Sequence, residues 1–209
     1  FTEVARLMRA LFHGKFGMTS IEKLNQTLLC CGDSGSGKTF NSQLAGNFIV
    51  ATTDTLLQES SPELNIMRHE ASTRAKELLD VDERAHHVFE AFGNAKTNSN
   101  DNSSRFGRYV KYQYTATNQL VSIYNETFFL EKSRLVELND GERNYHIFYQ
   151  LFRGMGSAYP ALKQRLHLHS VNDFKMLVGG NCVNLPDVQI DVQGFHTTKT
   201  SLESFDASD

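Results

Sequence analysis

The sequence predicts an α/β fold, in which a mixed β-sheet is flanked by helices. The apolar run QTLLCC, residues 26–31, ends at Gly32, as expected of a buried parallel strand. A glycine-rich run, residues 32–39, comes next and leads into a helical pattern, so we expect that helix to begin near Gly37 and pack on a central strand. From Phe106 onward apolar residues alternate with polar ones, which is typical of strands.

The first half of the chain is predicted to be mainly helical. Apolar residues repeat at helical spacing in residues 1–12, and residues 38–53 can form a helix after the glycines. Residues 54–64 are polar and are expected to form a loop. Two further helices are predicted, at 65–80 and at 83–94, the second ending at Gly93-Asn94.

The second half begins with an unusually polar tract, AKTNSNDNSS, residues 95–104, whose composition alone favours a loop. Residues 106–125 are predicted to form an antiparallel hairpin at or beside the same sheet, with a turn near 117–118. The segment ERNYHIFYQLFRGM predicts a helix with one apolar face, formed by Ile147, Phe148, Leu151 and Phe152.

Composition and charge exclude some classes of function. The net charge of −3 gives no overall basic field for nucleic acid. No apolar run approaches the roughly 20 residues that span a bilayer, so no transmembrane segment is expected. The chain has 209 residues and does not begin with Met, and we interpret it as an excerpt of a longer protein.

The segment GDSGSGKT fits the phosphate-binding pattern G-x-x-x-x-G-K-[ST] without a mismatch. Glycines let consecutive backbone N–H groups turn toward one anion, and the following helix points its positive dipole end at the same place. The alternative is a chance match in a loop of Gly and Ser, but the strand–loop–helix context favours a phosphate site. The predicted binding residues are Gly32, Asp33, Ser34, Gly35, Ser36, Gly37, Lys38 and Thr39.

A second polar segment, NSNDNSSRFG at residues 98–107, holds hydroxyls and an arginine just before a strand. Such a loop can sense a γ-phosphate, with Ser on Mg²⁺ and Arg or Asn on phosphate oxygens. Taken together with GDSGSGKT, the stretch EAFGNAKTNSNDNSSRFGRY strongly resembles the P-loop and switch I of the myosin motor domain. FLEKSRLVE and GERNYHIFYQL also look like segments of that family, in the same order. The resemblance covers nearly the whole chain.

The resemblance implies a role for individual residues. Lys38 would bind the β- and γ-phosphates and act in catalysis, and Thr39 would bind Mg²⁺. In switch I, Asn100 would contact the phosphate chain, Ser103 would position the attacking water, and Ser104 would bind Mg²⁺. Arg105 would pair with a glutamate of switch II. The LEKSR and ERNYHIFYQL segments would be structural or transducing. Asp33 and Ser36 replace the family's usual Glu and Ala.

Other parts of such a motor are not recognisable in residues 1–209. DVQGF, residues 191–195, looks like switch II at first sight, but His196 stands where Glu is expected, and we reject it. We therefore find no partner for Arg105, no converter and no lever arm, and we expect at most trace ATPase activity from this piece alone.

The resemblance implies the ATP-binding, ATP-hydrolysing core of an actin-based cytoskeletal motor, a Mg²⁺-dependent P-loop ATPase in the cytoplasm. It also implies actin filaments as a partner, and light chains or calmodulin on a lever arm outside this sequence. A kinesin-like motor is the first alternative, but kinesins follow the switch I Arg with Ser-His, and here Phe106-Gly107 follow. A small P-loop kinase would not explain NSSRFG. An inactive myosin-like nucleotide-binding scaffold is the third alternative.

Overall fold

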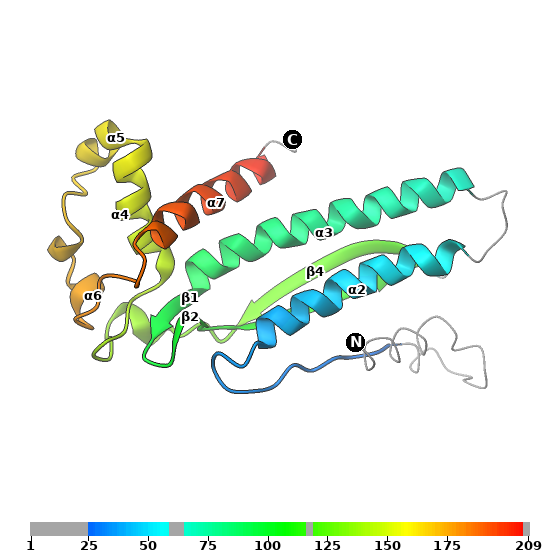
Figure 1. The fold of residues 1–209 in the computed structure, drawn as a ribbon, viewed down its shortest axis with the longest axis horizontal. Coiled ribbons are helices and arrows are strands. Elements are labelled where there is room, and N and C mark those ends of the chain that lie inside the picture. The colour runs from blue at the N-terminus through cyan, green and yellow to red at the C-terminus, as the bar shows by residue number, and fades with distance from the viewer. Residues whose placement is uncertain (1–24, 59–64, 116–118, 207–209) are drawn as a thin grey trace. The chain divides into compact units, whose positions relative to one another are not determined.

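A computed structural model describes residues 25–58, 65–115 and 119–206 of the chain. The chain divides into two compact units, which are described separately below (Figure 1). The first unit comprises the described residues up to Asp80 together with Val110–Tyr124. The second comprises Val81–Tyr109 and the described residues from Asn125 onward. The helix predicted at residues 1–12 and the turn predicted near 117–118 lie outside the described residues.

The first unit contains helix α2 and parts of three longer elements, α3, β3 and β4, whose remaining residues belong to the second unit. Their bounds are Lys38–Gln58 for α2, Asn65–Gly93 for α3, Gly107–Tyr114 for β3 and Leu120–Phe128 for β4. Val50 from α2, Ala75 from α3 and Leu120 from β4 form a buried apolar cluster. Burial of these side chains holds the helices of this unit against its strands.

The predicted central strand at residues 26–31 is not present. Residues 25–32 have no regular secondary structure, and the side chain of Leu29 is 79% exposed. A central strand needs hydrogen-bonding neighbours on both sides, and none of the described residues pairs with this segment. Helix α2 therefore has no strand from residues 26–31 to pack on, which corrects the prediction.

The helix boundaries are partly as predicted. Helix α2 begins at Lys38, immediately after Gly37, and α3 ends at Gly93. However, α2 continues to Gln58, so residues 54–58 are helical rather than a loop. The two helices predicted at 65–80 and 83–94 are one continuous helix, since no glycine or proline separates them.

The predicted hairpin is confirmed, because β3 and β4 pair with each other. The backbone N–H of Thr115 donates to the carbonyl of Gln119 at 2.9 Å and helps to close its turn. Half-buried and exposed residues alternate along β3, with Val110 and Tyr112 on one face and Lys111 on the other, as predicted. The described strands lie in two separate two-stranded sheets, however, and not in one mixed sheet. The molecule combines helices and strands as the α/β prediction requires.

The polar tract at residues 95–104 is not a loop. It forms most of an antiparallel hairpin of β1, Asn94–Thr97, and β2, Asn100–Ser104. Composition misled the prediction because polar side chains of this tract make hydrogen bonds within the protein. For example, the Thr97 hydroxyl donates to the carbonyl of Asn100 at 3.1 Å and accepts from its backbone N–H at 3.2 Å.

The rest of the second unit is helical. Its elements are η3 Lys132–Leu135, α4 His146–Ala158, α5 Pro160–Arg165, η4 Val171–Asp173, α6 Lys175–Val178 and α7 Gln189–Asp206. Tyr149, Phe152 and Leu177 form its apolar core. The predicted face of α4 is only partly correct, because Phe152 is buried whereas Ile147 and Leu151 are half-buried.

The segment DVQGF lies in helix α7, where it contacts α4. A Cβ atom on Gly194 would come within 2.5 Å of the Gln150 side chain, and one on Gly154 would clash with Phe195. The glycine and phenylalanine of this segment therefore serve close helix packing. None of the helices in the described ranges is both long and apolar enough to cross a bilayer.

Candidate functional site

The GDSGSGKT segment forms a glycine turn that leads directly into helix α2. Gly32, Gly35 and Gly37 all have positive φ angles, of 150°, 80° and 83°, which L-residues rarely adopt. The backbone N–H of Ser36 donates to the carbonyl of Asp33 at 3.2 Å. The glycines are therefore required by the backbone path of the turn.

Lys38 holds this turn closed. Its ammonium group donates to the carbonyls of Gly32 and Asp33, at 2.7 and 2.6 Å. Because Lys38 is the first residue of α2, these bonds place a positive charge beside the start of the helix, where the helix dipole is also positive. Thr39 is exposed on the first turn of α2. This arrangement suits an anionic ligand.

The remaining predicted residues lie in the second unit, with Asn100, Ser103 and Ser104 on strand β2 and Arg105 directly after it. Ser103 is 3% exposed, whereas Ser104 is exposed, so the two neighbouring hydroxyls point to opposite faces of the strand. Asn100 is half-buried, and its side chain accepts from the backbone N–H of Asn102 at 3.0 Å and donates to its carbonyl at 3.3 Å. The predicted switch I residues are therefore fixed on a strand and its turn.

Sequence reasoning missed a hydrogen-bonded cluster around Asn102. The side-chain Oδ1 of Asn102 accepts from Asn94 Nδ2 at 2.9 Å and contacts His146 Nε2 at 3.1 Å. The side-chain amide nitrogen of Asn102, Nδ2, donates to Glu90 Oε1 at 3.2 Å. These partners come from three elements, α3, β1 and α4, so no local sequence pattern could indicate them.

His146 is kept neutral in this cluster. Burial lowers its pKa from 6.5 to about 4, and the positive charge of Arg143 adds to the effect, although Glu90 and Asp101 oppose it. Since the Asn102 oxygen faces Nε2, that nitrogen carries the proton. A neutral His146 therefore helps to hold β2 in place through Asn102.

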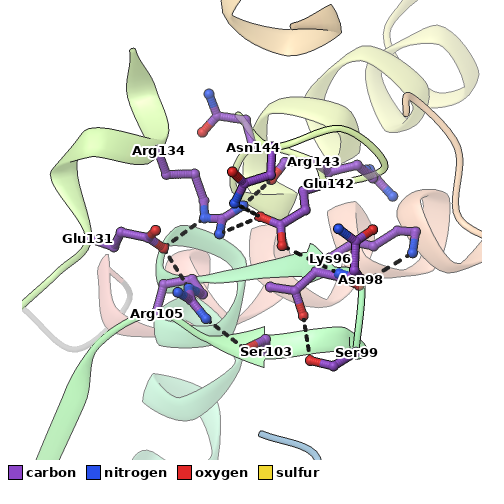
Figure 2. Close-up of polar contacts among 12 residues, drawn as sticks. Lys96, Asn98, Ser99, Ser103, Arg105, Glu131, Arg134, Glu142, Arg143 and Asn144 are labelled. Atoms are coloured by element: carbon purple, nitrogen blue, oxygen red, sulfur yellow. Dashed lines mark hydrogen bonds and ion pairs between the residues drawn. The ribbon is translucent and has the colours of Figure 1, made fainter. Parts of the chain in front are cut away.

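Arg105 has a carboxylate partner, Glu131, which the sequence analysis did not identify. Its Nε donates to Oε2 of Glu131, from the LEKSR segment, at 2.5 Å, and its Nη1 donates to the Ser103 hydroxyl at 3.2 Å (Figure 2). This partner was missed because Glu131 lies 26 residues further along the chain.

Glu131 also binds a second arginine, Arg134. Arg134 Nε lies 2.9 Å from the same Oε2 atom, while its Nη2 pairs with Glu142 at 3.0 Å (Figure 2). Burial by itself would raise the pKa of Glu131, but the hydrogen bonds and charges of Arg105 and Arg134 lower it overall. The carboxylate is therefore ionised at neutral pH and shared between two guanidinium groups.

A deeper ion pair lies beneath this network. Arg143 and Asp191 are 0% and 1% exposed, and Arg153 also contacts Asp191, at 3.0 Å. Burial raises the pKa of Asp191 more than the two arginines lower it. The charged residues that support the β1–β2 hairpin thus come from the LEKSR and ERNYHIFYQL segments.

Comparison with known proteins gives one consistent family. The family model of the myosin head (motor domain) matches residues 15–209. The chain is 37% identical to Myosin-1 of Arabidopsis thaliana over 182 residues, which are 87% of this chain and 14% of that protein. It is 35% identical to Myosin-2A of Naumovozyma castellii over 182 residues, covering 85% of this chain and 11% of that protein. Myosin-52 of Schizosaccharomyces pombe is 34% identical over 186 residues, covering 88% and 12%.

Proposed function

Because the chain belongs to the myosin motor-domain family, we propose that it forms the ATP-binding, ATP-hydrolysing core of an actin-based motor. The chain spans 10–14% of the length of the curated relatives that it matches. The activity is therefore proposed for the whole protein to which these residues contribute. Actin filaments are its proposed partner, and light chains or calmodulin would bind outside residues 1–209. We place it in the cytoplasm, on the cytoskeleton, with no role in nucleic-acid binding.

One observation carries the proposal for residues 32–39, namely the glycine turn closed by Lys38 at the start of α2. In a P-loop NTPase core, such a turn binds the phosphates of ATP through backbone N–H groups and the lysine. The carbonyl oxygens of Gly32 and Asp33 keep the ammonium group near the turn. Lys38 is thereby preorganised, which lowers the cost of binding.

The residues on β2 are proposed to act as switch I, on the resemblance to the family's switch I segment. Asn100 would contact the phosphates, and Ser103, which accepts from Arg105, would position the attacking water. Thr39 and Ser104 fit Mg²⁺ because hydroxyl oxygens suit this hard cation and both residues are exposed. Bound there, Mg²⁺ would neutralise charge on the phosphates.

The test is ATP binding by the full-length protein carrying Lys38→Ala. Loss of a charged donor should weaken binding of a fluorescent ATP analogue by about 10- to 100-fold, and hydrolysis should be lost with it. Lys111→Ala is the matched control, since Lys111 is an exposed lysine on β3. The control should bind and hydrolyse ATP normally.

Two results would contradict the proposal in different ways. Unchanged binding in Lys38→Ala would show that residues 32–39 do not hold the phosphates. Tight ATP binding by the unmutated protein without any hydrolysis, with or without actin, would instead identify an inactive scaffold.

A further inference from the structure

The side chain of Arg105 is held at two of its three nitrogens. Nε donates to Glu131 Oε2 at 2.5 Å, and Nη1 donates to the Ser103 hydroxyl at 3.2 Å. In the part of the chain that the structure describes, Nη2 makes no hydrogen bond. Because a guanidinium group is planar and rigid, fixing Nε and Nη1 also fixes the direction of Nη2.

Glu131 is itself firmly placed. Its backbone N–H donates to the carbonyl of Arg105 at 3.0 Å, and its own carbonyl accepts from the Tyr145 hydroxyl at 2.6 Å. Its carboxylate is also bound by Arg134, whose side chain is 3% exposed and is anchored by Glu142 and by the carbonyl of Arg143. Glu131 therefore has a fixed position that does not depend on the side chain of Arg105.

The Arg105–Glu131 pair differs from the Arg134–Glu142 pair in its exposure. The side chains of Arg105 and Glu131 are 29% and 30% exposed, whereas those of Arg134 and Glu142 are 3% and 10% exposed. Solvent screens this half-buried pair more than the buried Arg134–Glu142 pair, so it adds less to stability. The value of the Arg105–Glu131 contact is therefore geometric, because it orients a guanidinium group beside Ser103.

We infer that Glu131 is a positioning residue for hydrolysis, which fixes the Arg105 side chain so that its Nη1 binds the Ser103 hydroxyl. This inference rests on the proposed function, in which Arg105 and Ser103 act on the attacking water. Glu131 acts through Arg105 and does not itself touch ATP.

The experiment compares Glu131→Ala, Arg105→Ala and the double variant in the full-length protein. Glu131→Ala should slow single-turnover ATP hydrolysis by about tenfold, because misplacement of a positioning group is costly. Binding of a fluorescent ATP analogue should not change. Glu137→Ala, at an exposed glutamate beyond η3, is the control and should hydrolyse ATP normally.

The double variant separates positioning from a general structural role. If Glu131 acts through Arg105, Glu131→Ala should cause no further loss of hydrolysis rate in the Arg105→Ala background. An equal loss in both backgrounds would overturn the inference, since Glu131 would then act through Arg134 and the fold. A normal rate in Glu131→Ala would also overturn it.

The same set of variants distinguishes this inference from the proposed function. If Lys38→Ala loses ATP binding while Glu131→Ala hydrolyses ATP at the normal rate, only the inference about Glu131 fails. If Lys38→Ala binds ATP normally, the proposed function fails first. Glu131→Gln provides a further check, because it keeps an oxygen acceptor for Arg105 Nε and should retain more activity than Glu131→Ala.

Discussion

Arg143 Nη2 donates to both carboxylate oxygens of Asp191, at 2.9 and 3.0 Å, and neither side chain is more than 1% exposed. The pair joins the segment before α4 to helix α7. The guanidinium carbon of Arg143 also lies 3.8 Å from the centroid of the Tyr149 ring. Arg143 Nε and Nη1 are buried without hydrogen-bond partners in the described structure, so Asp191 is its principal neutralising contact.

We expect Asp191→Ala to destabilise α7 by about 3–5 kcal/mol, because a buried arginine would lose its carboxylate. Glu203→Ala on the same helix removes only a solvent-exposed i,i+4 pair with Lys199 and should cost far less. Hydrogen exchange of the α7 amides in the full-length protein measures both changes. Equal protection in the two variants would show that the buried pair does not hold α7.

The helix ends and strands that depend on neighbouring residues alone could be predicted from the sequence. The start of α2 after Gly37 and the end of α3 at Gly93 follow from glycine alone, and the β3–β4 hairpin follows from alternation. The local sequence pattern could not show whether residues 26–31 form a strand, because a buried strand depends on hydrogen-bonding partners elsewhere in the chain. Its apolar residues have no such partner among the described residues.

The candidate site was predicted less completely than the helices. The glycine turn and the hydroxyls of β2 were found because their motifs are contiguous. The contact between Arg105 and Glu131 and the pair of Arg143 with Asp191 span 26 and 48 residues, and charge gives no indication of which acid meets which base. Asn102 was missed because its hydrogen bonds also depend on tertiary contacts.

The neutral state of His146 predicts a loss of stability in acid. Its pKa is about 4 in the folded protein, against 6.5 for an unperturbed histidine, so the unfolded chain binds the proton first as pH falls. The stabilisation is complete above pH 6.5 and decreases between pH 6.5 and about 4, by up to about 3 kcal/mol. The groups facing His146 are Arg143, Glu90 and Asp101, and Asn102 accepts from it.

Comparison with His146→Gln isolates this effect from other titrating groups. The difference in stability between the unmutated protein and His146→Gln should shrink as pH falls from about 7.5 to about 5, measured by hydrogen exchange in β1 and β2 with correction for intrinsic rates. His169→Gln, at an exposed histidine, is the control. A difference that is independent of pH would contradict the neutral, buried state of His146.

Ser104→Ala tests the proposed Mg²⁺ role of the exposed hydroxyl on β2. Because Ser103 faces inward and Ser104 outward, Ser104→Ala removes the outward hydroxyl and leaves that of Ser103 in place. Removing a hydroxyl ligand should raise the Mg²⁺ concentration needed for half-maximal ATP hydrolysis by about tenfold, while ATP binding without Mg²⁺ should change little. Ser157→Ala, at an exposed serine of α4, serves as the control.

Single-turnover hydrolysis over a Mg²⁺ titration gives the half-maximal Mg²⁺ concentration, and binding of the fluorescent ATP analogue in EDTA gives the affinity without Mg²⁺. An unchanged Mg²⁺ requirement in Ser104→Ala would remove Ser104 from the proposed metal site, while equal losses with and without Mg²⁺ would show that Ser104 supports the hairpin rather than the cation.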